Sequence, residues 1–215
     1  MARSSSTREG WAPRSWPPDE RAAAQLREWL AIPEGERGVG SDLDFSAAQL
    51  PGLDVRGFWL VRSAFRATVL REARLGHTHL DRSDFTGADL TEADLTDAEG
   101  EGTVLREAVL RSAVLRGCEF FGADLSGADL SGAALADAAF YDTRFDGANL
   151  SGGTADKLVL RDSVFDGADV TGFTGTVVGP IRLVLRGERT SIDGPELEQW
   201  FAARGAAVRR FVPQA

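Results

Sequence analysis

Large apolar side chains recur at every fifth position over more than half of this sequence. Positions 45, 50, 55 and onward to 170 make 26 slots, and 24 of them hold Leu, Phe or Val. The two exceptions are Gly100 and Ala155. A helix repeats its apolar face about every 3.6 residues and a strand every two, so neither gives a strict period of five. The pattern therefore indicates a repeat architecture.

The residue two positions before each slot follows a second rule. It is small (Ala, Ser, Thr, Cys or Gly) in 22 of the 26 units, and the exceptions are Leu43, Leu53, Phe58 and Leu158. Residues two apart in an extended chain point to the same side, so we expect both positions to face inward. Glycine is the second residue after the slot in 12 units. This preference predicts a corner with positive φ at that position.

Four such corners close a square of 20 residues, and the slots also show this longer period. Sorting them by twenties gives a column that we expect to form the structural core: Phe45, Phe65, Phe85, Leu105, Leu125, Phe145 and Phe165. The sequence thus predicts an all-β fold, a right-handed quadrilateral parallel β-helix over residues 41–175. At about 4.8 Å per rung, six and a half coils make a rod of roughly 31 Å. Gly100 and Ala155 lack a large side chain, which predicts a bulge or local distortion at both.

The flanking segments are expected to cover the ends of the rod. We predict a disordered tail over residues 1–17 and a capping helix with its connector over 18–40, because an open coil end exposes apolar core and unpaired backbone. Residues 176–215 predict a strand over 181–185, a second strand to Ile192, a helix closed by Gly205, and a last strand over 208–212. The apolar side chains of that helix are Leu197, Trp200 and Phe201.

Several units resemble a known motif. Ser126-Gly-Ala-Asp-Leu130 and Asp146-Gly-Ala-Asn-Leu150 resemble the Ala-(Asp/Asn)-Leu-Xaa-Xaa repeat of the pentapeptide-repeat family. The best understood members of that family are DNA mimics that bind type II topoisomerases and protect them from quinolones or other gyrase poisons. The resemblance therefore implies DNA gyrase as a partner and an antibiotic-resistance role. It also implies that residues 176–215 can pair two chains into a homodimer, whereas a plain end cap is the alternative.

Charge and composition narrow the classes of function. Residues 41–175 carry 23 acidic and 12 basic side chains, and the flanking segments are neutral or slightly basic. Binding of phosphate groups needs a basic face, so nucleic acid is not the expected ligand. One cysteine rules out a disulfide framework and suits a reducing cytosol. No signal-peptide run and no stretch of 18 apolar residues is present, so we expect a cytoplasmic protein with no membrane partner.

Two groups of surface residues are candidate partner sites. The first is an acidic strip within about one coil: Asp81, Asp84, Asp89, Glu92, Asp94, Asp97, Glu99 and Glu101. Duplex DNA carries one charge per about 1.7 Å of axis, and the rod carries one acidic group per about 1.3 Å, or one net charge per about 2.8 Å. These values permit phosphate mimicry, and a solvated surface supplied by the repeat motif is the alternative. The second group is an aromatic face of Trp59, Phe121 and Tyr141, which either anchors a protein partner or lies under a terminal segment.

No catalytic constellation is visible in the sequence. His77 and His79 are predicted to be surface residues, because a metal site needs three or four ligands in fixed geometry. Cys118 occupies a small inward slot and is predicted to be a buried filler. We expect a non-enzymatic protein without cofactor or metal, and our first hypothesis is a DNA mimic that binds gyrase. The rival is a structural or adaptor scaffold that binds another protein through its aromatic face and termini.

Overall fold

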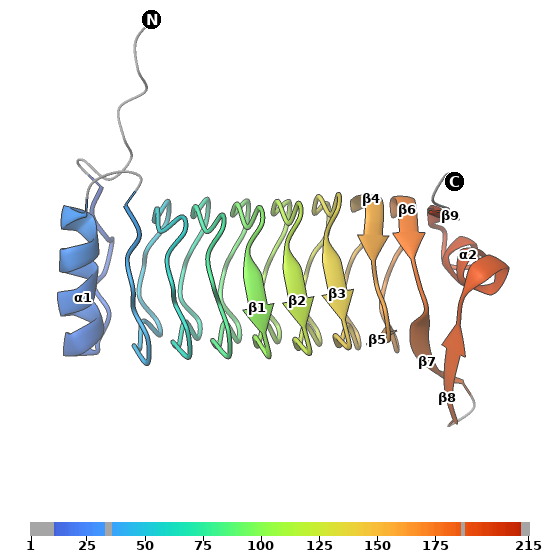
Figure 1. Cartoon of the computed structure of the whole chain (residues 1–215), viewed down its shortest axis with the longest axis horizontal. Coiled ribbons are helices and arrows are strands. Elements are labelled where there is room, and N and C mark those ends of the chain that lie inside the picture. Colours follow the sequence, from blue (N-terminus) through green and yellow to red (C-terminus); the bar gives the residue numbers. More distant parts are fainter. Residues whose placement is uncertain (1–10, 33–35, 186–187, 212–215) are drawn as a thin grey trace, which may run out of the picture.

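In the computed structural model, which describes residues 11–32, 36–185 and 188–211, the repeats form a straight rod with a helix at each end (Figure 1). Parallel bridges join residues that are 20 positions apart, from Val39–Trp59 to Asn149–Asp169. Each coil therefore takes 20 residues and four sides. The fold is the quadrilateral parallel β-helix that the sequence predicts.

The corners have the predicted backbone conformation. The second residue after each slot, from Ala47 to Gly172, has φ between +49° and +71°. In most units the N–H three residues after a slot donates to the carbonyl of that slot, as from Leu53 to Leu50 at 3.2 Å. A hydrogen bond of this kind with positive φ at the third residue is typical of a type II turn. Corners such as Glu72, which are not glycine, adopt the same conformation.

The slots fill the inside of the rod. All seven residues of the predicted core column are buried, and the phenylalanine rings on successive coils stack along the axis. The ring centroids of Phe45 and Phe65 are 4.9 Å apart, and those of Phe65 and Phe85 are 4.7 Å apart. Small residues fill the space between these large side chains, and their hydroxyls are satisfied. The buried Thr68 hydroxyl, for example, donates to the Phe45 carbonyl at 2.9 Å.

One side of the rod has longer strands than the other three. β1 (Glu99–Glu101), β2 (Glu119–Phe121), β3 (Ala139–Tyr141), β4 (Thr154–Val159), β6 (Thr174–Val178) and β9 (Ala207–Arg210) form a parallel sheet in this order. The expected bulge at Gly100 is wrong, because β1 and β2 pair in register and the Phe120 ring occupies the space that a Cβ at Gly100 would need. The expected bulge at Ala155 is confirmed, because the register shifts between Ala155 and Leu158.

The N-terminal helix covers the first coil. α1 spans Glu20–Ala31, and the Asp19 carboxylate caps it by accepting the Ala22 N–H at 2.7 Å. The Trp29 ring lies 5.3 Å from Phe45 and 5.4 Å from Phe58, between centroids, so it closes the apolar end of the core. This contact explains the oversized inward residue Phe58.

The segment before α1 was expected to belong to a disordered tail. Residues 1–10 lie outside the described residues. The described part contacts the first coils: the Trp11 indole N–H donates to the Pro51 carbonyl at 2.8 Å, and Ser15 forms an antiparallel bridge with Gln49. These contacts extend the N-terminal cap over the side of the rod.

The C-terminal segment covers the last coil. β5 (Ser163–Val164) pairs with β7 (Ile181–Leu185), which forms an antiparallel pair with β8 (Glu188–Ile192), and α2 spans Gly194–Ala202. The α2 side chains Leu197, Trp200 and Phe201 are buried, and the Phe201 ring stacks 6.1 Å from Phe173. These contacts are what an end cap requires, and a homodimer formed by this segment stays a prediction. The described residues form two helices, α1 and α2, and neither is long and apolar enough to cross a membrane.

Candidate protein-interaction face

The eight residues of the predicted acidic strip lie on all four sides of the rod. Asp84, Asp89, Asp94 and Glu99 each precede one of four successive slots, and successive slots lie on successive sides because a coil takes 20 residues. Glu92 and Asp97 occupy two different corners. The eight therefore form a ring around one coil, and a partner that contacts one side meets fewer than half of them.

Three of these carboxylates belong to the framework, and one of them, Asp94, accepts the Thr96 N–H at 3.0 Å and the Thr96 hydroxyl at 2.6 Å. Asp84 Oδ1 accepts the Thr86 N–H at 2.9 Å and the Thr86 hydroxyl at 2.6 Å, while Oδ2 accepts Arg66 Nε from the preceding coil at 2.5 Å. Asp89 has the same partners in Thr91 and Arg71. Partial burial acts to raise the pKa of Asp84, but the hydrogen bonds from Thr86 and Arg66 outweigh it and lower that pKa. Their bonds hold turns and adjacent coils together.

Three other members of the ring lie on the side that carries β1, β2 and β3, which we call the strand face. Asp81, Glu99 and Glu101 project from it, and Glu119 of β2 lies directly beyond Glu99 in the parallel register. Glu99, Glu101 and Glu119 are exposed. Asp81 accepts the Glu101 N–H at 2.7 Å. This side therefore presents carboxylates on successive coils.

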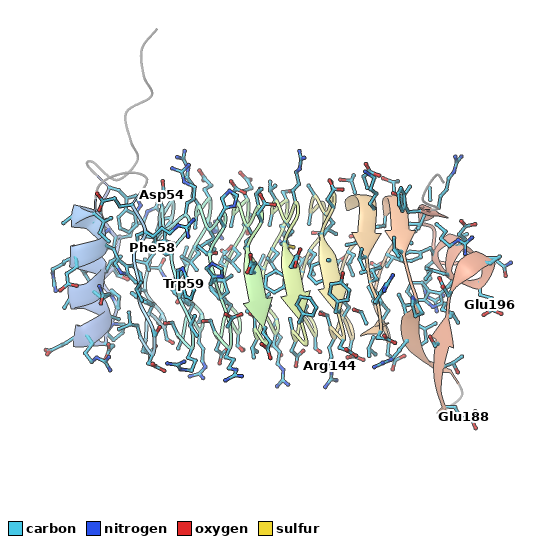
Figure 2. All side chains as sticks on the ribbon, in the orientation of Figure 1. Asp54, Phe58, Trp59, Arg144, Glu188 and Glu196 are labelled. Carbon is cyan, nitrogen blue, oxygen red and sulfur yellow. The ribbon has the colours of Figure 1, made fainter. Side chains whose placement is uncertain are left out.

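The predicted aromatic residues lie on the same strand face. Trp59, labelled in Figure 2, packs against His79 with ring centroids 4.4 Å apart and planes tilted by 44°, and His79 Nδ1 lies 3.3 Å from Glu99 Oε2. Phe121 and Tyr141 stack with centroids 4.5 Å apart and planes 8° apart. Trp59 is 45% exposed and Phe121 46% exposed. The described parts of the terminal segments thus leave both rings accessible to solvent.

A hollow of about 560 Å³ lies at the edge of the strand face, beside the stacked rings. Its lining residues are Glu101, Gly102, Phe121, Gly122 and Asp142. The period of 20 residues already places Phe121 and Tyr141 at the same outward position of successive coils, with Glu119 and Asp142 beside them in the sequence. Glu101 was expected in the acidic strip, and Gly102 and Gly122 were not expected in a site, because glycine marks corners throughout the repeat.

The remaining candidate residues have ordinary environments. His77 is exposed and its Nδ1 lies 3.6 Å from Asp97 Oδ2. Cys118 is buried at its small inward slot, and burial raises the pKa of its thiol. Among the described residues, no group of three or more His, Cys, Asp or Glu side chains is arranged to hold a metal ion.

Comparison with known proteins identifies the repeats. The family model described as pentapeptide repeats matches eight copies, over residues 68–99, 101–127 and 113–152. The matched part of the rod, within residues 68–152, therefore consists of pentapeptide repeats. No curated protein matches the sequence.

Solved structures show the same fold. Full-length QnrB1, a plasmid-mediated fluoroquinolone resistance protein, superposes with a TM-score of 0.58 at 23% identity, over 67% of this chain and 77% of QnrB1. A trypsin-treated variant of QnrB1 gives a TM-score of 0.56 at 22% identity, over 67% of this chain and 74% of that one. At this identity the likeness concerns the fold.

Proposed function

We propose that this protein acts without catalysis, in the cytoplasm, by binding a DNA-handling protein, and that DNA gyrase is the partner. The observation that carries the proposal is the row of exposed carboxylates on the strand face, where Glu99, Glu101 and Glu119 belong to adjacent coils. Strands in parallel register are about 4.8 Å apart, and duplex DNA offers one phosphate charge per about 1.7 Å of axis. The strand face carries four carboxylates over three successive coils, Asp81, Glu99, Glu101 and Glu119. This is one charge per about 3.6 Å, roughly twice the spacing of phosphate charges along duplex DNA.

The choice of gyrase rests on the family resemblance. The repeat motif is that of a family whose best understood members mimic DNA toward type II topoisomerases. The fold similarity to QnrB1, a fluoroquinolone resistance protein, supports the same direction. The caps at both ends leave the sides of the rod for a partner, and the net excess of acidic groups over residues 41–175 suits a basic DNA-binding groove.

The test is gyrase supercoiling with and without the purified protein, with and without a quinolone, over a salt series. The decisive variant replaces Glu99, Glu101 and Glu119 with Gln. The matched control replaces Glu72, Glu92 and Glu107 with Gln, because these three are exposed at corners away from the strand face and the change in net charge is identical. We expect the protein to inhibit gyrase or to protect it from the quinolone, and we expect this effect to weaken as the salt concentration rises. The first variant alone should show an effect about tenfold weaker than that of the unaltered protein. Equal effects of the two variants would contradict strand-face mimicry.

A second candidate function is an adaptor that binds a different protein through its aromatic residues. The exposed Phe121 ring, stacked on the partly buried Tyr141, favours it, because accessible aromatic side chains are frequent anchors of protein interfaces. In that case Phe121→Ala abolishes partner binding while the triple Gln variant retains it. The same two variants therefore separate the two functions.

A further inference from the structure

The hollow beside Phe121 has an aromatic wall and a floor without side chains. Phe121 and Tyr141 present parallel rings, and the corners next to them, Gly102 and Gly122, have φ of +63° and +60°. A Cβ built on Gly122 meets no atom within 4 Å. The space is therefore open to a side chain from outside.

This opening results from two successive glycines in one column of corners. The equivalent corner holds Asp42, Arg62 and Arg82 in the preceding coils and Asp142 in the following one. Charged side chains occupy the corner in those coils, and the Gly102–Gly122 pair interrupts the column beside the only stacked aromatic pair on the described surface of the strand face. The flat ring wall and the gap thus occur together.

Carboxylates surround the opening. Glu101 lies one coil before Phe121, Glu119 lies beside it on β2, and both are exposed. In the described part of the chain, neither forms an ion pair. Asp142 lies at the other edge and is 3.2 Å from Arg182 Nη1. The nearby cations are Arg82, whose Cγ lies 3.8 Å from a Cβ built on Gly102, and Arg161, one coil after Tyr141.

We propose that this hollow binds the guanidinium group of an arginine side chain on the protein partner. A guanidinium is planar, stacks on aromatic rings and donates two parallel hydrogen bonds to a carboxylate. Phe121 provides the ring face, and Glu101, which lines the hollow, provides the acceptor oxygens. A lysine ammonium is compact and strongly hydrated, so it uses the carboxylates and gains less from the ring. The inference rests on the proposed protein-binding function and does not require that the partner is gyrase.

The test uses the single tyrosine of the chain as a reporter. Tyr141 is the only Tyr, so ring ¹³C-tyrosine labelling of the full-length protein gives one set of ring signals next to the hollow. The probes are three acetylated and amidated peptides, Gly-Arg-Gly, Gly-Lys-Gly and Gly-citrulline-Gly. Citrulline has the shape of arginine without its charge. We expect saturable shifts with the arginine peptide at millimolar concentration, and at least fivefold weaker binding of the citrulline peptide.

Variants then separate the hollow from general charge attraction. Phe121→Ala and Glu101→Gln are each expected to weaken arginine binding about threefold, the scale of an exposed cation–π or ion-pair contact. Gly122→Asn fills the hollow with a residue that tolerates positive φ, and it should abolish the shifts. The matched control is Gly87→Asn, because Gly87 has φ of +64°, open surroundings and a position on another corner. Unchanged Tyr141 signals, equal citrulline binding, or equal effects of the two glycine variants would overturn the inference.

The gyrase assay tests the proposed function, and the peptide titration tests the hollow, so a negative result in one does not decide the other. Arginine binding without any effect on gyrase leaves the hollow as a site and points to another partner. An effect on gyrase that persists in Gly122→Asn, together with absent peptide shifts, refutes the hollow alone.

Discussion

Two carboxylates of the predicted strip, Asp84 and Glu101, have opposite roles, and alanine variants of the two should separate stability from binding. Asp84→Ala removes two hydrogen bonds from Thr86 and the contact with Arg66. Each net hydrogen bond contributes about 0.5–1.5 kcal/mol, and the Arg66 pair about 0.5 kcal/mol because the arginine side chain is 61% exposed. The sum is about 2 kcal/mol, or about 4–8 °C in Tm for a chain of this size.

Glu101→Ala should leave stability within about 0.5 kcal/mol, because its side chain is exposed and holds no part of a turn. Thermal and urea unfolding followed by circular dichroism measure the stability, and the gyrase assay or the arginine-peptide titration measures binding. Asp84→Asn is the control for geometry: its amide oxygen still accepts from Thr86, so about 0.5 kcal/mol is lost. Equal losses of stability in Asp84→Ala and Glu101→Ala would refute the division into framework and surface carboxylates.

Three further predictions concern the rod itself. Gly87→Ala should destabilise the protein by about 1 kcal/mol through its positive φ alone. Gly175→Ala should cost several times more, because a Cβ there lies 1.8 Å from the Ala155 carbonyl oxygen. Urea unfolding of both variants measures the two losses, and equal losses would contradict the added clash. Trp29→Ala should lower the free energy of unfolding by about 3–5 kcal/mol. It should also expose the end of the core, so light scattering should detect association on warming. An unchanged melting curve would contradict the capping role. Acid should also destabilise the protein. Partial burial acts to raise the pKa of Asp129 and of Asp84, but hydrogen bonds outweigh it and lower the pKa of both. A carboxyl group with a lowered folded-state pKa adds stability at pH values above its ordinary pKa of 3.8, and this stability is lost as the pH falls through the folded-state pKa. We therefore expect Tm to decrease when the pH drops below about 4 and to stay constant between pH 5 and 7.

Residue periodicity was sufficient to predict the architecture. In a coil of four short sides, each inward position has one allowed size, so the rule of a large and a small residue repeats at every fifth position and needs no tertiary information. The same rule predicts the positive φ at the corners, because glycine is preferred there. It also predicts the cap made by α1, because Phe58 is too large for an inward position that another coil would cover. The bulge expected at Ala155 is present, where the pairing with β6 shifts from an offset of 20 residues to 19, whereas Gly100 keeps its register because Phe120 fills the void.

Which polar side chains act together was decided by the tertiary structure. A run of acids along the sequence becomes a ring around the rod, because neighbours on one side are 20 residues apart. The same coiling joins Asp84 to Arg66, places Glu101 beside Phe121, and brings Arg182 of the C-terminal hairpin to Asp142, 40 residues away. The repeat leaves outward positions free of packing constraints, so their local sequence carries no signal of contact. The inward residues were readable in sequence because each must fit a fixed space, and the period of 20 also paired Phe121 with Tyr141. The tertiary structure decided that Glu101 and the corners Gly102 and Gly122 join these rings in one hollow, because those residues come from different coils.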